Sequence, residues 1–339
     1  MSAPARAERV LRWGILGTGR VTRWIIAALR ASERNEAVAV GSRDAGRAAA
    51  FAREWAIPRG VAGYAALVED PGIDVVYNAL PNHLHVEWTI AAARAGKHVL
   101  CEKPIALTAE DVDRVADAAR ASGVVVAEGF MYRHHPQTEK VRELVRAGAI
   151  GALQLVRGSF TITLARPDDV RLDPALGGGS LWDVGCYPVG WARLLAGTEP
   201  LEAVGWDVRG ETGIDEAFAG QLRFAPQRAG GPEVLAQIDS GFRMPFRAQV
   251  EVVGTAGVIA VARPYKPQPR ETFTLTREDE VQAVEVAGPE PYRGEVEDIA
   301  DAVLLGRPPR IPLSDSRGNV AALQALLRSA AQGRPVRPT

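Results

Sequence analysis

The sequence contains little cysteine and little histidine, and both shortages limit what the protein can be. Of its 339 residues, 2 are cysteine and 5 are histidine. The two cysteines, Cys101 and Cys186, are far apart and lack the spacing of a metal-binding motif. We therefore expect two buried, small apolar side chains in a reducing compartment, rather than a disulfide or a catalytic thiol.

Long apolar runs and an excess of one charge are also missing. No apolar run approaches the roughly 20 residues that a membrane-spanning helix needs, and residues 1–10 lack the apolar core of a signal peptide. The 40 basic and 41 acidic residues nearly cancel, to a net charge of −1. His83, His85, His134 and His135 form two pairs without matching carboxylate or cysteine spacing, so we expect no metal site. These absences predict a soluble, cytoplasmic protein that binds neither nucleic acid nor membrane.

The first part of the chain alternates short apolar runs with helix-like stretches. A chain of 339 residues exceeds the size at which one hydrophobic core keeps growing, so we expect two domains. Strands that are separated by helices predict right-handed βαβ units and a parallel Rossmann sheet. The expected strands are 11–16, 37–42, 74–80, 98–101 and 124–127, and the expected helices are 21–31, 44–56, 82–95 and 109–121.

After Gly129 the pattern changes to successive strands joined by short turns. The turn Val253–Gly257 is typical of such a connection and predicts a large, open, mainly antiparallel sheet within an α+β domain. We expect a dinucleotide-binding domain over 1–128 and a substrate-binding and oligomerisation domain over 129–339. The expected strands are 153–164, 202–208, 217–224, 234–242, 249–253, 257–262, 272–276 and 281–286, and the expected helices are 137–147, one near 179, 294–305 and 314–331.

A glycine-rich turn, Gly17-Thr18-Gly19-Arg20-Val21, follows the first expected strand and opens the first expected helix. Such a turn lets the backbone approach a pyrophosphate, which binds at the helix N-terminus. Counted from Gly17, the third glycine of G-x-G-x-x-G is replaced by Thr22. That glycine serves helix–strand packing rather than phosphate contact, so we still expect dinucleotide binding.

The end of the second expected strand indicates which nicotinamide cofactor is bound. NAD-specific sites usually place an acid here for the ribose 2′-hydroxyl, whereas this chain has Ser42 and Arg43. A hydroxyl and a guanidinium suit a 2′-phosphate. We interpret Asp44 as the N-cap of the next helix. We therefore expect NADP to be preferred and leave open whether NAD is tolerated.

Three more polar segments follow expected strands, and a fourth opens a helix in the second part. They are Leu80–His85, Cys101-Glu102-Lys103-Pro104, Glu128–Pro136 and Gly177–Tyr187. In these segments, from about residue 11 to at least 262, the chain resembles the glucose–fructose oxidoreductase/inositol dehydrogenase/MocA family. Tyr187, where inositol dehydrogenases have histidine, resembles the branch of the NADP-dependent xylose dehydrogenases and dimeric dihydrodiol dehydrogenases.

The resemblance implies roles for individual residues. Tyr187 matches the family's catalytic acid/base, Lys103 matches the lysine of its E-K-P element, and Asp183 matches the carboxylate one turn earlier, on the same helix face as the tyrosine. It also implies a cis peptide at Lys103–Pro104. Arg133, His135, Arg171 and Asp183 are candidate contacts of a substrate. Candidate cofactor contacts are Gly17, Thr18, Gly19, Arg20, Val21, Ser42, Arg43, Leu80, Pro81, Asn82, His85, Glu102 and Lys103.

The chemistry of a Lys103/Tyr187 pair suits hydride transfer between NADP and an alcohol carbon. The hydroxyl proton needs a base with a pKa near the working pH, and a phenol begins about three units too high, a gap of roughly 4 kcal/mol. A lysine ammonium about 4 Å away contributes about that much at an effective dielectric constant near 20. No metal is required.

Several functions fit these residues. We expect an aldose 1-dehydrogenase that oxidises a sugar such as xylose or glucose with NADP. The alternatives are a keto-sugar reductase, whose substrate could be nucleotide-linked, an oxidoreductase of dihydrodiols or dicarbonyls, and an NADP-binding regulator without turnover. The resemblance also implies a homodimer or homotetramer that assembles through the C-terminal sheet.

Overall fold

The computed structural model describes residues 9–166 and 168–339, which form two compact units. The first unit contains the chain up to Ile105 together with Glu110–Met131 and Tyr292–Leu313. The second contains Ala106–Ala109, Tyr132–Pro291 and Ser314–Thr339. The predicted domains, 1–128 and 129–339, do not include this late return of the chain to the first unit.

The first unit is built on a six-stranded parallel sheet with the strand order β3-β2-β1-β4-β5-β6. Dinucleotide-binding domains share this order, in which the chain changes direction between β1 and β4. The predicted Rossmann fold is confirmed. Its strands are β1 (Leu11–Leu16), β2 (Asn35–Ser42), β3 (Arg59–Ala62), β4 (Val75–Asn78), β5 (His98–Glu102) and β6 (Val126–Gly129).

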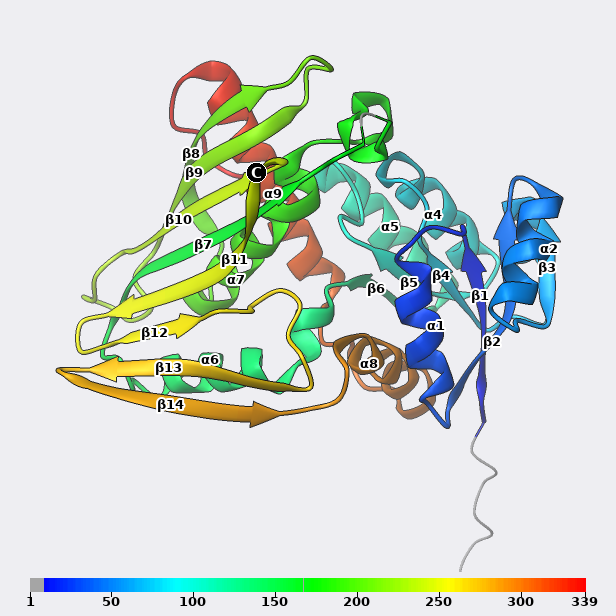
Figure 1. The fold of residues 1–339 in the computed structure, drawn as a ribbon, viewed down its shortest axis with the longest axis horizontal. Coiled ribbons are helices and arrows are strands. Elements are labelled where there is room, and N and C mark those ends of the chain that lie inside the picture. The colour runs from blue at the N-terminus through cyan, green and yellow to red at the C-terminus, as the bar shows by residue number, and fades with distance from the viewer. Residues whose placement is uncertain (1–8, 167) are drawn as a thin grey trace, which may run out of the picture. The chain divides into compact units, whose positions relative to one another are not determined.

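Helices flank this parallel sheet, which lies to the right in Figure 1. Both faces are therefore covered, and the central strands β1 and β4 are almost wholly buried and apolar. The sequence pattern missed β3 and the short helix after it because β3 has only four residues, none of them buried. The helices are α1 (Thr22–Arg30), α2 (Ala45–Glu54), α3 (Tyr64–Val68), η1 (Asn82–Leu84), α4 (His85–Arg94), α5 (Ala109–Ser122) and α8 (Pro291–Leu305).

The second unit is built on an eight-stranded sheet with the order β14-β13-β12-β11-β7-β10-β9-β8. The pair β7–β10 is parallel and the other pairs are antiparallel, as the predicted, mainly antiparallel sheet requires. The strands are β7 (Leu153–Thr163), β8 (Pro200–Arg209), β9 (Asp215–Phe224), β10 (Val234–Gly241), β11 (Arg243–Gly254), β12 (Val258–Val261), β13 (Arg270–Arg277) and β14 (Glu280–Ala287).

Helices pack on one face of this second sheet and leave the other face open. A Cβ at Gly158 of β7 would lie 2.5 Å from Cβ of Pro188, so glycine is needed where the strand meets α7. Across the same face, a Cβ at Gly205 would lie 2.8 Å from the carbonyl oxygen of Leu326 in α9. The helical segments are η2 (Met131–His134), α6 (Pro136–Arg146), η3 (Val170–Leu172), η4 (Pro174–Leu176), η5 (Leu181–Gly185), α7 (Cys186–Ala196) and α9 (Leu313–Gln332).

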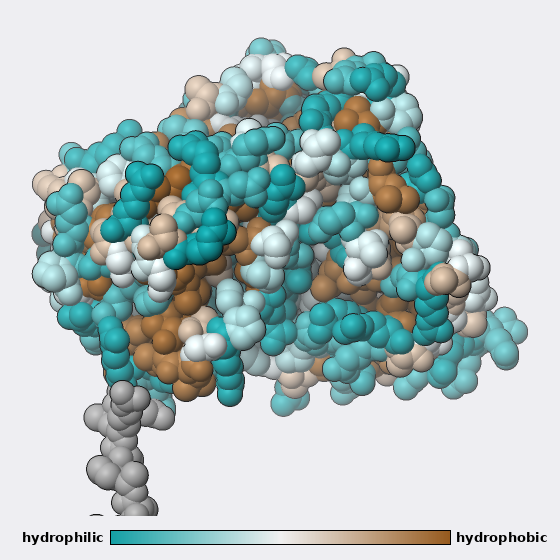
Figure 2. Space-filling model, turned by 180° about the vertical axis from the view of Figure 1, so that it is seen from behind, coloured by the Kyte–Doolittle hydropathy of each residue, from teal (hydrophilic) through white to brown (hydrophobic). Residues whose placement is uncertain are grey.

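The outer surfaces are mainly polar. In the view from behind, hydrophilic side chains cover most of the visible face, with smaller apolar areas between them (Figure 2). Within residues 9–166 and 168–339, no helix combines the length and the apolar character that crossing a membrane requires. The two cysteines are buried and free, as predicted.

Candidate active site

The glycine-rich turn leaves β1 through a residue that must be glycine. Gly17 has φ +94°, and a Cβ there would lie 3.2 Å from the carbonyl oxygen of Ala79 and 3.3 Å from Cδ2 of Leu80. Its N–H donates to the carbonyl of Gly41 over 3.0 Å, which fixes the turn against the end of β2. The turn therefore holds Gly17 close to Ala79 and Leu80, where a side chain would be crowded.

Thr22, which stands in place of the third glycine, closes the first turn of α1. Its hydroxyl donates to the carbonyl of Gly19 over 2.6 Å, and its side chain is buried. Thr18 is half-exposed, whereas Gly19 and Arg20 are exposed. Exposed backbone N–H groups at a helix N-terminus bind anions, so this turn fits the pyrophosphate of a dinucleotide. The predicted residues from Gly17 to Val21 all belong to this turn.

Ser42 and Arg43 lie at the end of β2, where the sequence places them. Ser42 is buried, and its hydroxyl oxygen accepts a hydrogen bond from the N–H of Asp44 over 3.3 Å. Asp44 accepts from the N–H of Arg47 over 2.6 Å and caps α2, which confirms its interpretation as an N-cap. Arg43 is exposed, and its guanidinium forms no ion pair with another residue in the described part of the chain. Its cation is therefore available to a phosphate.

The loop after β4 is held by a residue that sequence reasoning missed. Asn78 is fully buried, and its amide donates to the carbonyl of His85 and to the hydroxyl of Thr89, each over 3.1 Å. Its carbonyl oxygen accepts from the N–H of Leu80 over 3.4 Å. The sequence did contain a signal for this role: a single asparagine ends the otherwise apolar strand Val75–Asn78, and a buried amide needs hydrogen-bond partners.

His85 joins the two loops that carry predicted cofactor contacts. Its ring nitrogens lie 2.7 Å from the carbonyl oxygens of Leu80 and Pro104. Burial of the ring lowers the pKa of His85 to about 4. The ring is therefore neutral near pH 7 and donates to one of the two carbonyls. This arrangement assigns His85 to positioning Leu80 and the loop of Lys103.

The residues of the E-K-P loop, Glu102-Lys103-Pro104, differ in their exposure to solvent. Glu102 is buried and accepts a hydrogen bond from the hydroxyl of Tyr77, whereas Lys103 is half-exposed. Burial, followed by the charge of Glu102, raises the pKa of Tyr77 well above its usual range. The Lys103–Pro104 peptide is cis, as the resemblance implied. The half-exposed Asn82 and Pro81 lie at the start of η1 in the preceding loop.

Tyr187, which the resemblance matches to a catalytic acid/base, lies just after the point where a π-helical turn becomes an α-helix. Asp183 lies in η5, which is a single turn of π-helix, and Tyr187 lies in the first turn of α7. The sequence predicted one regular helix through both residues. The structure instead widens the turn between them, a distortion that occurs frequently at functional sites.

A buried carboxylate fixes the start of this distorted helix. Asp215 accepts hydrogen bonds from the hydroxyl of Ser180 over 2.8 Å and from the N–H of Leu181 over 2.7 Å. Gly179 has φ +128°, and a Cβ there would lie 2.4 Å from Oδ1 of Asp215. Burial raises the pKa of Asp215 to about 6. Sequence reasoning missed Asp215 because it stands 34 residues after Leu181 and 35 after Ser180, the two residues that it holds.

Arg171 and Asp183, both predicted as substrate contacts, contact each other. Nε of Arg171 lies 2.7 Å from Oδ2 of Asp183, and its Nη1 lies 3.1 Å from Oδ1 of Asp169. The charge of Asp183 is the main cause that raises the pKa of Arg171. The Arg171 side chain is 42% exposed and that of Asp183 is 17% exposed, so the pair faces solvent in part.

Aromatic rings surround Tyr187. Its ring centroid lies 5.3 Å from that of Phe160, 5.5 Å from that of Tyr265 and 5.8 Å from that of Tyr132. Tyr187 itself is 2% exposed. These rings come from β7, the loop after β12 and η2, which are far apart in the sequence. Apolar surroundings fix the phenol's orientation and exclude water from it.

The other two predicted substrate contacts have partners within the second unit. Nη1 of Arg133 donates to Oδ2 of Asp315 over 2.9 Å. Nδ1 of His135 accepts from the N–H of Gln137 over 3.1 Å, so His135 is the N-cap of α6. Burial lowers the pKa of His135. Within the described residues, no group of three or more histidine, cysteine or acidic side chains is arranged to hold a metal ion.

Comparisons with known proteins identify the family. Residues 11–130 match a family described as "Oxidoreductase family, NAD-binding Rossmann fold", and residues 138–260 match the "GFO/IDH/MocA C-terminal domain". The chain belongs to the GFO/IDH/MocA oxidoreductase family. The predicted family, the oxidoreductase class and the nicotinamide-binding domain are thereby confirmed.

Relatives of this family act on different sugars. The chain is 38% identical to D-xylose 1-dehydrogenase (NADP(+)) 2 of Haloferax volcanii, over 96% of this chain and 99% of that protein. It resembles the crystal structure of an aldose-aldose oxidoreductase from Caulobacter crescentus, with a TM-score of 0.88, 27% identity and coverage of 97% of this chain and 100% of the other. A 3-ketoreductase from Actinomadura kijaniata, solved with NADP and TDP-benzene, has a TM-score of 0.87, 30% identity and coverage of 95% and 98%. The chain is thus an oxidoreductase of the sugar-converting type.

Proposed function

We propose that this protein is an NADP-dependent dehydrogenase of a sugar-like substrate, with oxidation of an aldopyranose such as xylose or glucose at C1 as the leading reaction. The observation that carries the proposal is the Tyr187 phenol, buried among aromatic rings at the start of α7, one turn after Asp183. The relative from Haloferax volcanii is named for this reaction and matches nearly the whole chain.

The residues have distinct roles in this proposal. NADP, held by the glycine turn and the end of β2, would supply the hydride acceptor for oxidation of the alcohol carbon and the hydride donor for the reverse reaction. Tyr187 takes the hydroxyl proton and, in the reverse direction, donates it. Lys103 stabilises the phenolate by its positive charge. Asp183, which Arg171 holds by an ion pair, orients the substrate hydroxyl or the tyrosine.

NADP rather than NAD follows from the end of β2. The exposed Arg43 cation and the Ser42 hydroxyl suit a 2′-phosphate, and the first acidic residue beyond them, Asp44, is used as a helix cap. Two relatives support this choice: the Haloferax volcanii enzyme is named for NADP(+), and the Actinomadura kijaniata structure contains NADP.

A second candidate is the reduction of a keto-sugar. The chain is 32% identical, over 96% of its length, to a dTDP-3,4-didehydro-2,6-dideoxy-alpha-D-glucose 3-reductase of Actinomadura kijaniata. The same Lys103 and Tyr187 would serve that reaction, so the two candidates differ in substrate and direction. A regulator without turnover is disfavoured because it has no need of Lys103, Asp183 and Tyr187 together.

A panel of substrates tests the proposal. Aldoses with NADP+ and keto-sugars with NADPH are followed by absorbance of the reduced nicotinamide, and binding of NADPH is followed by fluorescence. We expect turnover of at least one aldose. Turnover of keto-sugars alone would favour the second candidate, and NADPH binding without any turnover would contradict both.

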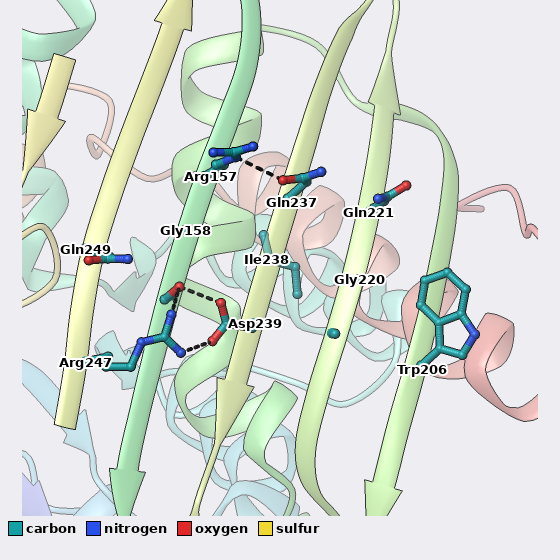
Figure 3. Close-up of a pocket in the computed structure, with 12 residues that line it drawn as sticks. Arg157, Gly158, Trp206, Gly220, Gln221, Gln237, Ile238, Asp239, Arg247 and Gln249 are labelled. Carbon is teal, nitrogen blue, oxygen red and sulfur yellow. Dashed lines mark hydrogen bonds and ion pairs between the residues drawn. The ribbon is translucent and has the colours of Figure 1, made fainter. Parts of the chain in front are cut away.

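We also infer that two copies of the chain associate through the open face of the second sheet. Charged and amide side chains line it: Arg247 pairs with Asp239 over 2.8 Å, and Arg157 donates to Gln237 over 3.0 Å (Figure 3). Trp206, on the edge strand β8 of the same face, is 62% exposed. A face with both charges and an exposed aromatic ring suits a two-fold contact, in which the same patch meets itself.

The oligomeric state tests this inference. Sedimentation at micromolar concentration should show a dimer or tetramer, and Trp206→Glu should shift it towards monomer because the ring is replaced by a charge. Trp24→Glu, at an exposed tryptophan of α1 in the other unit, is the matched control. A wild-type monomer, or an unchanged assembly in Trp206→Glu, would contradict the inferred contact.

A further inference from the structure

A pocket on the helix-covered face of the second sheet has no role in the mechanism described so far. It has a volume of about 420 Å³, within the range of roughly 300–1,000 Å³ that small-molecule sites occupy. Phe160 of β7 lies two residues after Gly158 and therefore on the face that α7 covers. Phe246 comes from the start of β11, and Arg263 and Lys266 come from the loop between β12 and β13.

Aromatic rings form one side of this pocket. Phe160 stacks on Tyr265 with ring centroids 4.9 Å apart, and the rings of Phe246 and Phe160 form a T-shaped pair with centroids 6.3 Å apart. Phe246 is 71% exposed, so it does not serve as a core residue of the unit. Exposed aromatic rings beside a hollow suit the flat, apolar face of a sugar or base ring.

The other side of the pocket is cationic. Arg263 and Lys266 are exposed lining residues, and no acidic residue lines the pocket with them. The Arg263 carbonyl accepts from Nε2 of Gln137 over 3.0 Å, which fixes its backbone. Its guanidinium forms no ion pair with any described residue. A guanidinium and an ammonium over one hollow favour a phosphate or carboxylate.

The pocket and the proposed catalytic tyrosine share a wall. Phe160 and Tyr265, which line the pocket, are also the rings that lie 5.3 and 5.5 Å from the ring of Tyr187. A substrate whose reacting carbon is at Tyr187 would therefore extend a neighbouring substituent over these rings towards Arg263 and Lys266.

We propose that this pocket binds a negatively charged substituent of the sugar-like substrate. The inference rests on the proposed function and changes its leading substrate: a sugar phosphate or sugar acid is preferred over neutral xylose or glucose for oxidation at C1, and a nucleotide-linked sugar is preferred for the second candidate, keto-sugar reduction. Arg263 and Lys266 bind the anion, and Phe246 packs on an adjoining ring.

The first experiment measures binding without turnover. Inorganic pyrophosphate is titrated by calorimetry into enzyme saturated with NADPH, which fills the phosphate sites of the first unit. We expect Arg263→Ala to weaken binding about five- to tenfold, since an exposed charge-assisted contact is partly screened. The double variant Arg263→Ala/Lys266→Ala should weaken it further, and added salt should do the same to wild type. Arg270→Ala, at a nearby exposed arginine outside the pocket, is the matched control and should bind as wild type does.

The second experiment compares sugars with and without an anionic group. Glucose, glucose 6-phosphate and glucuronate have a free C1 hydroxyl and test oxidation at that carbon. In UDP-glucose C1 is bonded to the diphosphate, so a nucleotide-linked sugar is tested through NADPH-dependent reduction of its keto form, beside the corresponding neutral keto-sugar. We expect one anionic member to have the higher kcat/KM, and Arg263→Ala to lower its ratio to the neutral sugar at least about fivefold, mainly through KM.

Two results would overturn the inference: pyrophosphate binding that is absent or equal in wild type and the double variant, or a preference for neutral sugars that Arg263→Ala leaves unchanged. The first result does not depend on the proposed function, because it is measured without turnover. Failure of that function would instead appear as pyrophosphate and NADPH binding without turnover of any sugar.

Discussion

The two units place their proposed site residues in different ways. In the first unit they occupy consecutive loops at the carboxyl ends of parallel strands, after β1, β2, β4 and β5. In the second unit they surround one helix, and the rings around Tyr187 come from η2, β7 and the loop after β12. The parallel sheet thus offers its proposed contacts on short loops, each within one segment, whereas the rings around Tyr187 come from separate segments between Tyr132 and Tyr265.

The two units also differ in how they use buried polar groups. In the first unit, the neutral His85 and Asn78 tie loops together through backbone carbonyls. In the second, the carboxylate of Asp215 holds the start of η5. Each buried group stabilises a segment that carries a proposed site residue. Substitution of Asn78 or His85 should therefore affect the loops that carry the proposed cofactor contacts and Lys103, and substitution of Asp215 should affect the helix that carries Asp183 and Tyr187.

The largest effect is expected at Tyr187. Tyr187→Phe keeps the ring among its aromatic neighbours and removes the hydroxyl. Because that hydroxyl is assigned to proton transfer, kcat should fall about 10²- to 10⁴-fold while NADPH affinity stays nearly unchanged. Steady-state kinetics and fluorescence titration measure the two quantities. Tyr64→Phe, in α3 of the first unit, is the matched control. Activity of Tyr187→Phe within about threefold of wild type would contradict the assignment of Tyr187 to proton transfer.

Asp215 should make stability depend on pH. Its pKa rises from 3.8 to about 6 in the folded protein, so between these values the folded state holds a proton that the unfolded chain has lost. The free energy of unfolding therefore falls as the pH rises from about 4 to 6, by about 3 kcal/mol for this group. Asp215→Asn removes this contribution, and the difference in unfolding free energy between wild type and variant should change by that amount over this range.

Chemical denaturation at several pH values measures the Asp215 effect. Asp279→Asn, at an exposed aspartate between β13 and β14, should leave the pH dependence of the wild type unaltered. A difference between wild type and Asp215→Asn that stays constant with pH would show that Asp215 is not a buried, protonatable carboxyl group.

A smaller effect is expected for cofactor choice in the first unit. A charge-assisted contact to a phosphate is worth roughly 1.5–3 kcal/mol, so Arg43→Ala should weaken NADP(H) about ten- to 150-fold and change NAD(H) little. Ser42→Asp should shift the preference further, because a carboxylate repels the phosphate and can bind a free ribose hydroxyl. The measured quantity is the ratio of kcat/KM for NADP+ to that for NAD+. A wild-type preference for NAD+, or an unchanged ratio in Arg43→Ala, would contradict the interpretation of this loop.

Features that depend on neighbouring residues could be predicted from the sequence, whereas features that depend on contacts between distant segments could not. The parallel sheet and the glycine turn were predictable because each depends on neighbouring residues, and β1 was predicted with its observed bounds. β3 was missed because none of its four residues is buried, and β11 begins at Arg243 rather than 249 because a register shift interrupts its first residues. Pairing of β7 with β10 in parallel depends on the whole sheet, so no local pattern indicates it.

The candidate site residues divide in the same way, into those within short motifs and those that act through distant contacts. Lys103, Asp183 and Tyr187 stand in short motifs that the sequence shows directly. Asp215, Asn78 and the ring of Tyr265 do not, since each acts through contacts with distant segments. The π-helical turn at Asp183 was also beyond prediction, because its surrounding sequence reads as an ordinary helix.

The central proposal is that Lys103 and Tyr187 act in one proton transfer. A double-mutant cycle of Lys103→Met and Tyr187→Phe tests it most directly, with kcat measured for the best substrate of the panel and NADPH binding as the check on folding. If the two groups act as a unit, each single variant should lose about 10²- to 10⁴-fold and the double variant should be little worse than either one. Losses that multiply in the double variant, or a Lys103→Met enzyme with nearly full kcat, would contradict the account.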